Sequence, residues 1–105
     1  MKAKRNPGGS IMASRWRRRR MCVLIDESPA PAALRHVSAT GAFLETNARP
    51  ELGRSVELHH PDAGAIVGTV RSLAPDGVGI RFECGERSVA FALAAIAADM
   101  SQPAA

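Results

Sequence analysis

The stretch AIVGTVRSLAPDGVGIRFE, residues 65–83, decides the fold class of this chain. Small or apolar residues occupy every second position on both sides of a central turn: Ile66, Gly68 and Val70 before it, and Val78, Ile80 and Phe82 after it. This two-residue period is typical of β-strands that turn one face toward a core. The turn, Ala74-Pro75-Asp76-Gly77, has Pro and Gly where tight turns use them. The stretch therefore predicts a β-hairpin.

Upstream of the hairpin the chain reads as short strands separated by turns. Pro29 and Pro31 lack the backbone N–H that a strand ladder uses, so they predict a break after the first strand. Closing six short strands into a barrel would remove their exposed edges. We therefore expect an all-β fold, a six-stranded antiparallel β-barrel with a C-terminal helix. The four upstream strands are expected at residues 20–25, 33–37, 42–46 and 55–59.

The expected helix runs from about residue 86 to residue 99, directly after the hairpin. Its many alanines favour helix over strand. Its larger aliphatic residues recur at the spacing of one helical stripe, at Val89, Leu93, Ile96 and Met100. We expect this stripe to pack on the barrel as part of the core.

Charge divides the chain into a basic N-terminal segment and a mildly acidic remainder. The formal net charge is +4, yet residues 1–20 hold eight basic residues and no acid, while the remainder has six arginines and ten acids. The segment RWRRRR, residues 15–20, is the densest part, and such a split indicates an anion-binding arm. We expect a flexible basic arm over residues 1–14, a folded domain over residues 15–100 and a disordered tail over residues 101–105.

Several classes of protein are disfavoured by the composition. No apolar stretch reaches the 18 residues of a membrane span, and Cys22 and Cys84 show no pairing pattern, so we expect reduced thiols in a cytoplasmic protein. His59 and His60 are adjacent and would point to opposite faces of a strand, which argues against a metal site. The chain has no phosphate-binding glycine loop and no nucleophile elbow, and we expect it not to be an enzyme.

Two short motifs remain, and their order along the chain resembles the PilZ domain family. The first is Arg15-x-x-x-Arg19. The second is His36-Val37-Ser38-Ala39-Thr40-Gly41, and it is followed by glycine–valine hairpins. The resemblance spans about residues 15–100. It implies a six-stranded β-barrel that binds the bacterial second messenger cyclic di-GMP.

The resemblance also implies a set of ligand-binding residues. Arg15 and Arg19 match the family's motif arginines, which contact the phosphates and guanine edges of the ligand; Ser38 and Gly41 match the serine and glycine of the second motif. His36 stands where the family has Asp or Asn. A neutral imidazole offers one acceptor nitrogen to a guanine edge and an imidazolium offers none, so this position departs from the pattern.

The resulting expectation is a non-enzymatic cyclic di-GMP receptor or adaptor. Ligand binding would order the arginine-rich arm and so switch a surface that contacts a protein effector, with no cofactor involved. Two alternatives stay open. One is a PilZ barrel that has lost its ligand and acts as a protein-interaction module. The other is a small nucleic-acid-binding protein that uses the basic arm, a partner class that the second motif disfavours.

Overall fold

The computed structural model describes residues 20–100 of the chain. The expected arm and tail, and the motif arginines Arg15 and Arg19, lie outside the described residues. The described part consists of six strands and one helix: β1 (Met21–Ile25), β2 (Pro29–Ser38), β3 (Gly41–Glu45), β4 (Ser55–His60), β5 (Gly64–Ala74), β6 (Gly77–Phe82) and α2 (Glu86–Met100).

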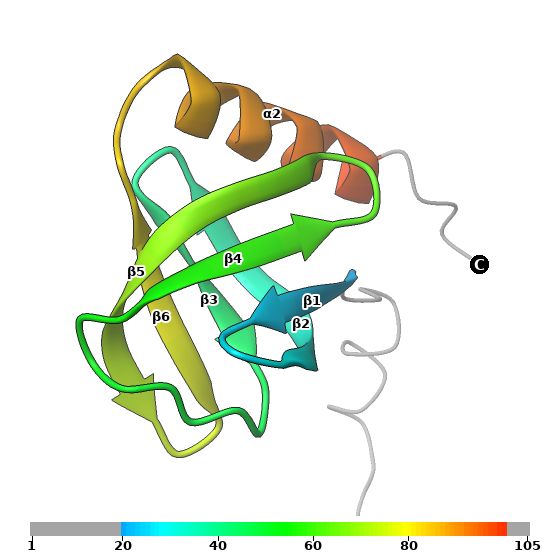
Figure 1. Ribbon diagram of the computed structural model, residues 1–105. Coiled ribbons are helices and arrows are strands. Elements are labelled where there is room, and N and C mark those ends of the chain that lie inside the picture. The colour runs from blue at the N-terminus through cyan, green and yellow to red at the C-terminus, as the bar shows by residue number, and fades with distance from the viewer. Residues whose placement is uncertain (1–19, 101–105) are drawn as a thin grey trace, which may run out of the picture.

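The six strands form one closed antiparallel barrel, which confirms the predicted fold class. Around the barrel the strands follow the order β1, β2, β3, β6, β5, β4, and β1 pairs with β4 to close it. Helix α2 lies across one end of the barrel (Figure 1). All but two of the pairings join strands that are consecutive in sequence; the exceptions are β3 with β6 and β1 with β4.

The barrel interior is filled by the inward positions of all six strands. The alternation predicted for the hairpin is confirmed, because Ile66 and Val70 of β5 and Val78, Ile80 and Phe82 of β6 are all at most 4% exposed. Removing these side chains from water supplies most of the driving force for folding a domain of this size. The largest fully buried side chains are Phe82, Leu24, Leu44, Leu58, Ile80, Val70 and Val78.

The predicted break at the two prolines is wrong, because both lie inside β2. Pro29 pairs with Ile25 and Pro31 with Val23 on β1. In an antiparallel ladder, residue pairs that exchange hydrogen bonds alternate with pairs that do not. The Leu34 N–H donates to the Arg20 carbonyl, so the pairs of Pro31 and Pro29, three and five residues before Leu34, are of the kind without hydrogen bonds. The proline nitrogens therefore face away from β1, toward a side where the pairing with β3 has already ended. On that side the Pro31 carbonyl accepts a hydrogen bond from Thr46 Oγ1, at 2.8 Å.

Helix α2 begins where the sequence predicts it. The buried Ser88 hydroxyl donates to the Gly85 carbonyl and accepts from the Gly85 N–H, each at 3.0 Å, which satisfies polar groups at the helix start. The helix packs against β2 and β5. Within residues 20–100, no helix is long and apolar enough to cross a membrane.

The face that α2 turns to the barrel is not the predicted one. The buried residues are Ser88, Phe91, Ala92 and Ala95. Phe91 meets Phe82 edge-on at 5.6 Å between ring centroids and meets the His60 ring at 6.0 Å. The stripe that we expected in the core is exposed: Val89 at 45%, Leu93 at 63%, Ile96 at 40% and Met100 at 77%. Phe91 decides the orientation, because it is the bulkiest apolar side chain of the helix and gains most from burial.

His60, the last residue of β4, is a buried polar group next to the helix. Its Nδ1 accepts hydrogen bonds from the backbone N–H groups of Asp62 and Ala63, both at 3.0 Å, so the ring carries its proton on Nε2. Burial lowers the pKa of His60 from its ordinary value of 6.5; the nearby Asp62 opposes this shift and Arg20 adds to it. The folded protein therefore holds this imidazole neutral.

We expect the protein to lose stability as the pH falls from 7 to 5. Below the ordinary histidine pKa of 6.5 the unfolded chain takes up a proton at residue 60 that the folded chain resists, so the free energy of unfolding drops with falling pH. The measurement is the melting temperature at pH 5, 6 and 7. His60→Asn, which keeps an acceptor, should show a smaller drop, whereas His59→Asn should behave as the wild type. An equal drop in melting temperature in all three proteins would show that His60 does not cause the loss of stability.

The two cysteines are free, and they differ in environment. Cys22 points into the barrel, and burial raises the pKa of its thiol to about 11 against a smaller opposing effect of Arg20. Cys84 is exposed between β6 and α2. Because the thiolate is the reactive form, Cys22 is a packing residue and Cys84 is the accessible thiol of the pair.

Candidate nucleotide-binding face

The second motif lies on the hairpin that joins β2 to β3. His36 and Ser38 are two residues apart on β2, and both side chains are exposed on the outer face of the barrel. Across the hairpin His36 pairs with Phe43, and Ser38 pairs with Gly41, the first residue of β3. The structure therefore brings these three motif positions, His36, Ser38 and Gly41, together on one outer surface.

Ser38 has a structural role in the turn of this hairpin. Its Oγ accepts a hydrogen bond from the Thr40 N–H at 3.2 Å and lies 2.9 Å from Thr40 Oγ1. Such a side-chain-to-backbone bond stabilises a tight turn. The Thr40 carbonyl accepts from the Phe82 N–H at 2.9 Å, which ties the turn to the end of β6. The hydroxyl is exposed, so it can also meet a ligand without a change in the turn.

Gly41 is required by the contact between β3 and β6. A Cβ built at this position would lie 2.3 Å from the Ile80 carbonyl oxygen and 3.3 Å from the Arg81 Cα. These are backbone atoms, which cannot move aside as a flexible side chain would. The motif glycine thus has a structural reason to be glycine, in addition to any role toward a ligand.

Arg81 of β6 is the functional candidate that the sequence did not identify. Gly41 pairs with Arg81, and Arg81 pairs with Thr69 of β5, so a cross-strand row runs Ser38, Gly41, Arg81, Thr69 on the outer face. With strands about 4.8 Å apart, Arg81 starts about 10 Å from Ser38. Arg81 is exposed and makes no ion pair or hydrogen bond through its side chain to the rest of residues 20–100. That Arg81 lies beside the second motif could be found only from the pairing of β3 with β6.

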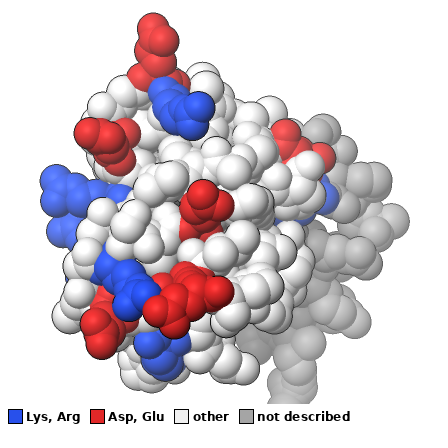
Figure 2. Space-filling model, viewed as in Figure 1, with Lys and Arg blue, Asp and Glu red and all other residues white. Residues whose placement is uncertain are grey.

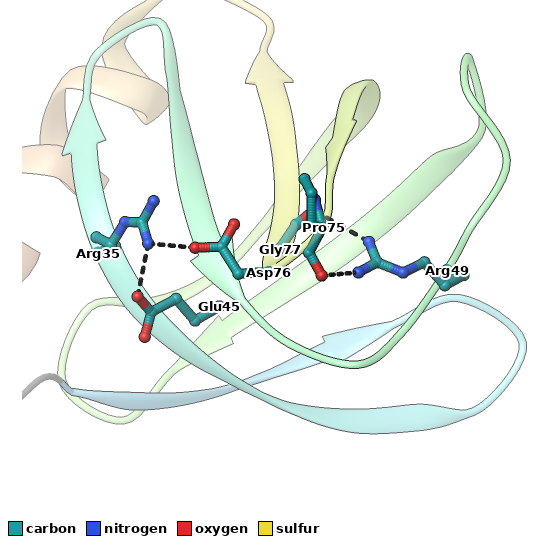
Figure 3. Close-up of polar contacts among 6 residues, drawn as sticks. All are labelled: Arg35, Glu45, Arg49, Pro75, Asp76 and Gly77. Atoms are coloured by element: carbon teal, nitrogen blue, oxygen red, sulfur yellow. Dashed lines mark hydrogen bonds and ion pairs between the residues drawn. The ribbon is translucent and has the colours of Figure 1, made fainter.

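Next to this row, Arg35 stacks on the ring of Phe43. Figure 3 shows the ion pairs that the same Arg35 makes with Glu45 and Asp76. The Phe43 ring lies against Gly77 and Gly79, where a Cβ at Gly77 would come within 2.7 Å of the ring. The guanidinium carbon of Arg35 lies 4.5 Å above the centre of that ring. Arg35 Nη1 also donates to Glu45 Oε2 at 2.6 Å and to Asp76 Oδ2 at 2.8 Å. The stack fixes the surface on which His36, the partner of Phe43, stands.

These ion pairs reduce the negative potential near the motif. The hydrogen bond from Arg35 lowers the pKa of Asp76, and the bonds to Glu45 and Asp76 raise the pKa of Arg35, so Arg35 offsets part of the negative charge of the two carboxylates. Arg49 holds the hairpin that carries Asp76, because it donates to the carbonyls of Pro75 at 2.6 Å and Gly77 at 3.2 Å. Arg35 therefore weakens the repulsion that Glu45 and Asp76 would exert on an anion at this face.

Arg20, the first described residue, lies close to this face. The Arg20 carbonyl accepts from the Leu34 N–H at 2.9 Å, so the chain reaches β1 beside the part of β2 that leads to His36. Leu34 and His36 are two residues apart along β2, about 7 Å. Arg20 itself is used structurally: its Nη2 donates to the Ala98 carbonyl at 3.2 Å, and its Nε lies 3.7 Å from Asp62 Oδ2.

A comparison with known protein families matches residues 14–92, well over half of the chain, to the PilZ domain. The chain belongs to the PilZ domain family. No curated protein and no solved structure matches it.

The PilZ match places both motifs inside the family region. It begins one residue before Arg15 and ends at residue 92, within α2. The family consists of cyclic di-GMP receptor and adaptor domains. The second half of α2 lies beyond the matched region. Among residues 20–100, no cluster of three or more His, Cys, Asp or Glu side chains is arranged to hold a metal ion.

Proposed function

We propose that this PilZ domain is a non-enzymatic receptor for cyclic di-GMP, bound on the outer face that carries His36, Ser38 and Gly41. The observation that supports it most is the entry of the arginine-rich segment at Arg20, about two residues along β2 from His36. An arginine pair just before Arg20 can reach a ligand on this face. The ligand would carry two phosphates and two guanines, both of which match guanidinium groups.

Each residue of the site has a distinct task in this proposal. Arg15 and Arg19 pair with phosphates and with the N7 and O6 edge of guanine. The Ser38 hydroxyl donates to the ligand when Thr40 Oγ1 is the donor in the bond between the two hydroxyls, while its oxygen accepts from the Thr40 N–H. Gly41 leaves room above β3, and Arg81, its neighbour on β6, meets a phosphate from the far side. His36 replaces the family's acidic or amide side chain with a single acceptor nitrogen.

The receptor works as a switch in this proposal. The like charges of Arg15 and Arg19 oppose their approach to one another, and an anionic ligand would neutralise them and draw them onto the outer face. The ordered segment then presents a new surface to a protein effector. Binding chemistry alone is needed for this, with no cofactor and no covalent step.

Titration calorimetry with cyclic di-GMP tests the proposal. We expect micromolar or tighter binding by the wild type, and a loss of at least tenfold in affinity when Arg15 and Arg19 are both changed to Ala, since each charged hydrogen bond is worth about 1.5–3 kcal/mol. The matched control is the Arg17→Ala, Arg18→Ala protein, which loses the same charge at positions outside the motif. Equal weakening in both proteins would show that only net charge counts.

A PilZ module without ligand is the second candidate, and the histidine at position 36, where the family has Asp or Asn, is the observation that favours it. In that case the folded wild type gives no binding heat at millimolar ligand, and His36→Asp restores none. If His36→Asp instead tightens binding, the histidine is a weakened ligand contact in a working site. Binding of random-sequence DNA with a steep salt dependence would point to the nucleic-acid alternative.

Arg81→Ala is expected to weaken cyclic di-GMP binding about tenfold, through the loss of one charge-assisted contact worth roughly 1.5 kcal/mol. The fold should stay intact, because the side chain is exposed and bonds to no other part of residues 20–100. Titration calorimetry measures the affinity, and Arg87→Ala on the helix, outside the row, is the control with equal charge loss. If wild type and Arg81→Ala bind equally, Arg81 is not part of the site although the receptor function stands.

A further inference from the structure

Helix α2 has two apolar stripes, and only one of them is used by the barrel. Ser88, Phe91, Ala92 and Ala95 face the strands. The other stripe consists of Val89, Leu93, Ile96 and Met100, which we call the outer stripe, and its members are between 40% and 77% exposed. The steps between its members are four, three and four residues, which is the alternating a/d spacing by which two helices pack along a seam.

The helix positions that surround the outer stripe between Arg87 and Asp99 carry no charge. Between Arg87 and Asp99 the helix has only apolar residues apart from Ser88, which is fully buried. The flanking positions Ala90 and Ala97 are exposed and small, so another helix could approach closely. In Figure 2 the surface over the middle of α2 is white. A helix that meets only water on this side would normally carry polar residues there.

We propose that the outer stripe pairs with the outer stripe of a second copy of this chain, with the two α2 helices antiparallel. Around a two-fold axis between residues 94 and 95, Val89 packs against Met100 of the partner subunit, and Leu93 packs against Ile96 of the partner subunit. The seam is self-complementary, because each large side chain meets an apolar side chain and each alanine flank meets an alanine flank.

The charges at the two ends of the helix select the antiparallel direction. Arg87 lies at the start of α2 and Asp99 at its end, and neither makes an ion pair with another of the described residues. In the antiparallel pair, Arg87 comes within about one helical turn of Asp99 of the partner subunit, and the symmetry makes this contact twice. In a parallel pair Arg87 would meet Arg87 and Asp99 would meet Asp99. The helix macrodipoles also oppose a parallel arrangement.

The size of the seam limits the strength of the dimer. A helix of 15 residues is about 22 Å long, so one helix pair buries less than the roughly 1,600 Å² of a standard stable interface. We therefore expect a monomer–dimer equilibrium that depends on concentration. Three of the four members of the outer stripe follow residue 92, where the family match ends.

Sedimentation equilibrium of the full chain without ligand tests the dimer. Between about 10 and 500 µM the weight-average mass should rise from that of the monomer, 11.1 kDa, toward twice that value, as mass action requires. Leu93→Glu should stay monomeric throughout, because it would bury a charge in the seam. The matched control is Leu52→Glu, which changes an equally exposed leucine, 62% against 63%, in the loop before β4 and should dimerise as the wild type does.

Charge reversal tests the direction of the helices. Arg87→Glu and Asp99→Arg should each weaken the dimer several-fold, and the double variant should restore it, because the two contacts are rebuilt with opposite sign. A wild type that stays monomeric at the highest concentration overturns the proposal. So does a dimer that Leu93→Glu leaves unchanged. A dimer that the double variant does not restore overturns the antiparallel arrangement. Circular dichroism of every variant shows whether the fold is kept.

Discussion

Phe91→Ala is expected to lower the free energy of unfolding by about 3–5 kcal/mol, the usual cost of truncating a buried phenylalanine. Phe91 is 4% exposed and joins α2 to the barrel through edge-on contacts with Phe82 and His60. The change leaves a cavity between the helix and the barrel end. Since a small domain has about 5–15 kcal/mol of stability in all, the variant should be close to unfolding.

Urea denaturation followed by circular dichroism measures this loss. Leu93→Ala is the matched control on the same helix, because Leu93 is 63% exposed. At a protein concentration that keeps the chain monomeric, we expect its effect to be within about 0.5 kcal/mol of zero. If Leu93→Ala cost more than Phe91→Ala, the helix would face the barrel with its outer stripe, as the sequence predicted, and the described orientation would be wrong.

Gly41→Ala is expected to cost about 3 kcal/mol of stability, at the upper end of what overpacking costs. The added Cβ would lie 2.3 Å from the Ile80 carbonyl oxygen, so β3 and β6 must separate at a pairing that has no other way to relax. Separation also moves Arg81 away from Ser38. Cyclic di-GMP binding should therefore weaken even at temperatures where the variant is still folded.

Gly85→Ala is the control for this change. No atom lies within 4 Å of a Cβ built at Gly85. We therefore expect the melting temperature of Gly85→Ala to stay within a few degrees of the wild type. The melting temperature of Gly41→Ala should drop by roughly 10–20 °C. Thermal melts of both variants and titration calorimetry below the melting range give the two results. A Gly41→Ala protein as stable as Gly85→Ala would show that the two strands are less closely packed than described.

The barrel was predictable because its signals are local. Alternation in β5 and β6 sets which side chains turn inward, and turn residues mark where strands end. The proline break was wrong for a reason that sequence hides: whether Pro31 is tolerated depends on which side of β2 still has a partner. The helix face was wrong for another reason. An alanine-rich helix offers two apolar stripes, and the choice rests on how Phe91 fits the barrel end.

In the candidate site, some residues could also be predicted from the sequence and others could not. His36, Ser38 and Gly41 follow from a motif within six consecutive residues, so the sequence contains all the information needed to place them together. Arg81 is forty residues from Gly41 along the chain, and only the pairing of β3 with β6 makes them neighbours. The compensation of Asp76 by Arg35 likewise depends on tertiary structure, since it joins β2 to the β5–β6 turn.

The pairing of β3 with β6 has a consequence for folding. Together with β1–β4 it is one of two pairings between strands that are distant in sequence, and such contacts form late because a long loop must be closed first. The Gly41–Arg81 junction lies at this late contact. An incomplete chain emerging from the ribosome would hold the second motif but not the surface around it. At the proposed face, ligand binding would then begin only after residue 81 is synthesised and the barrel is closed, and it would report completed folding.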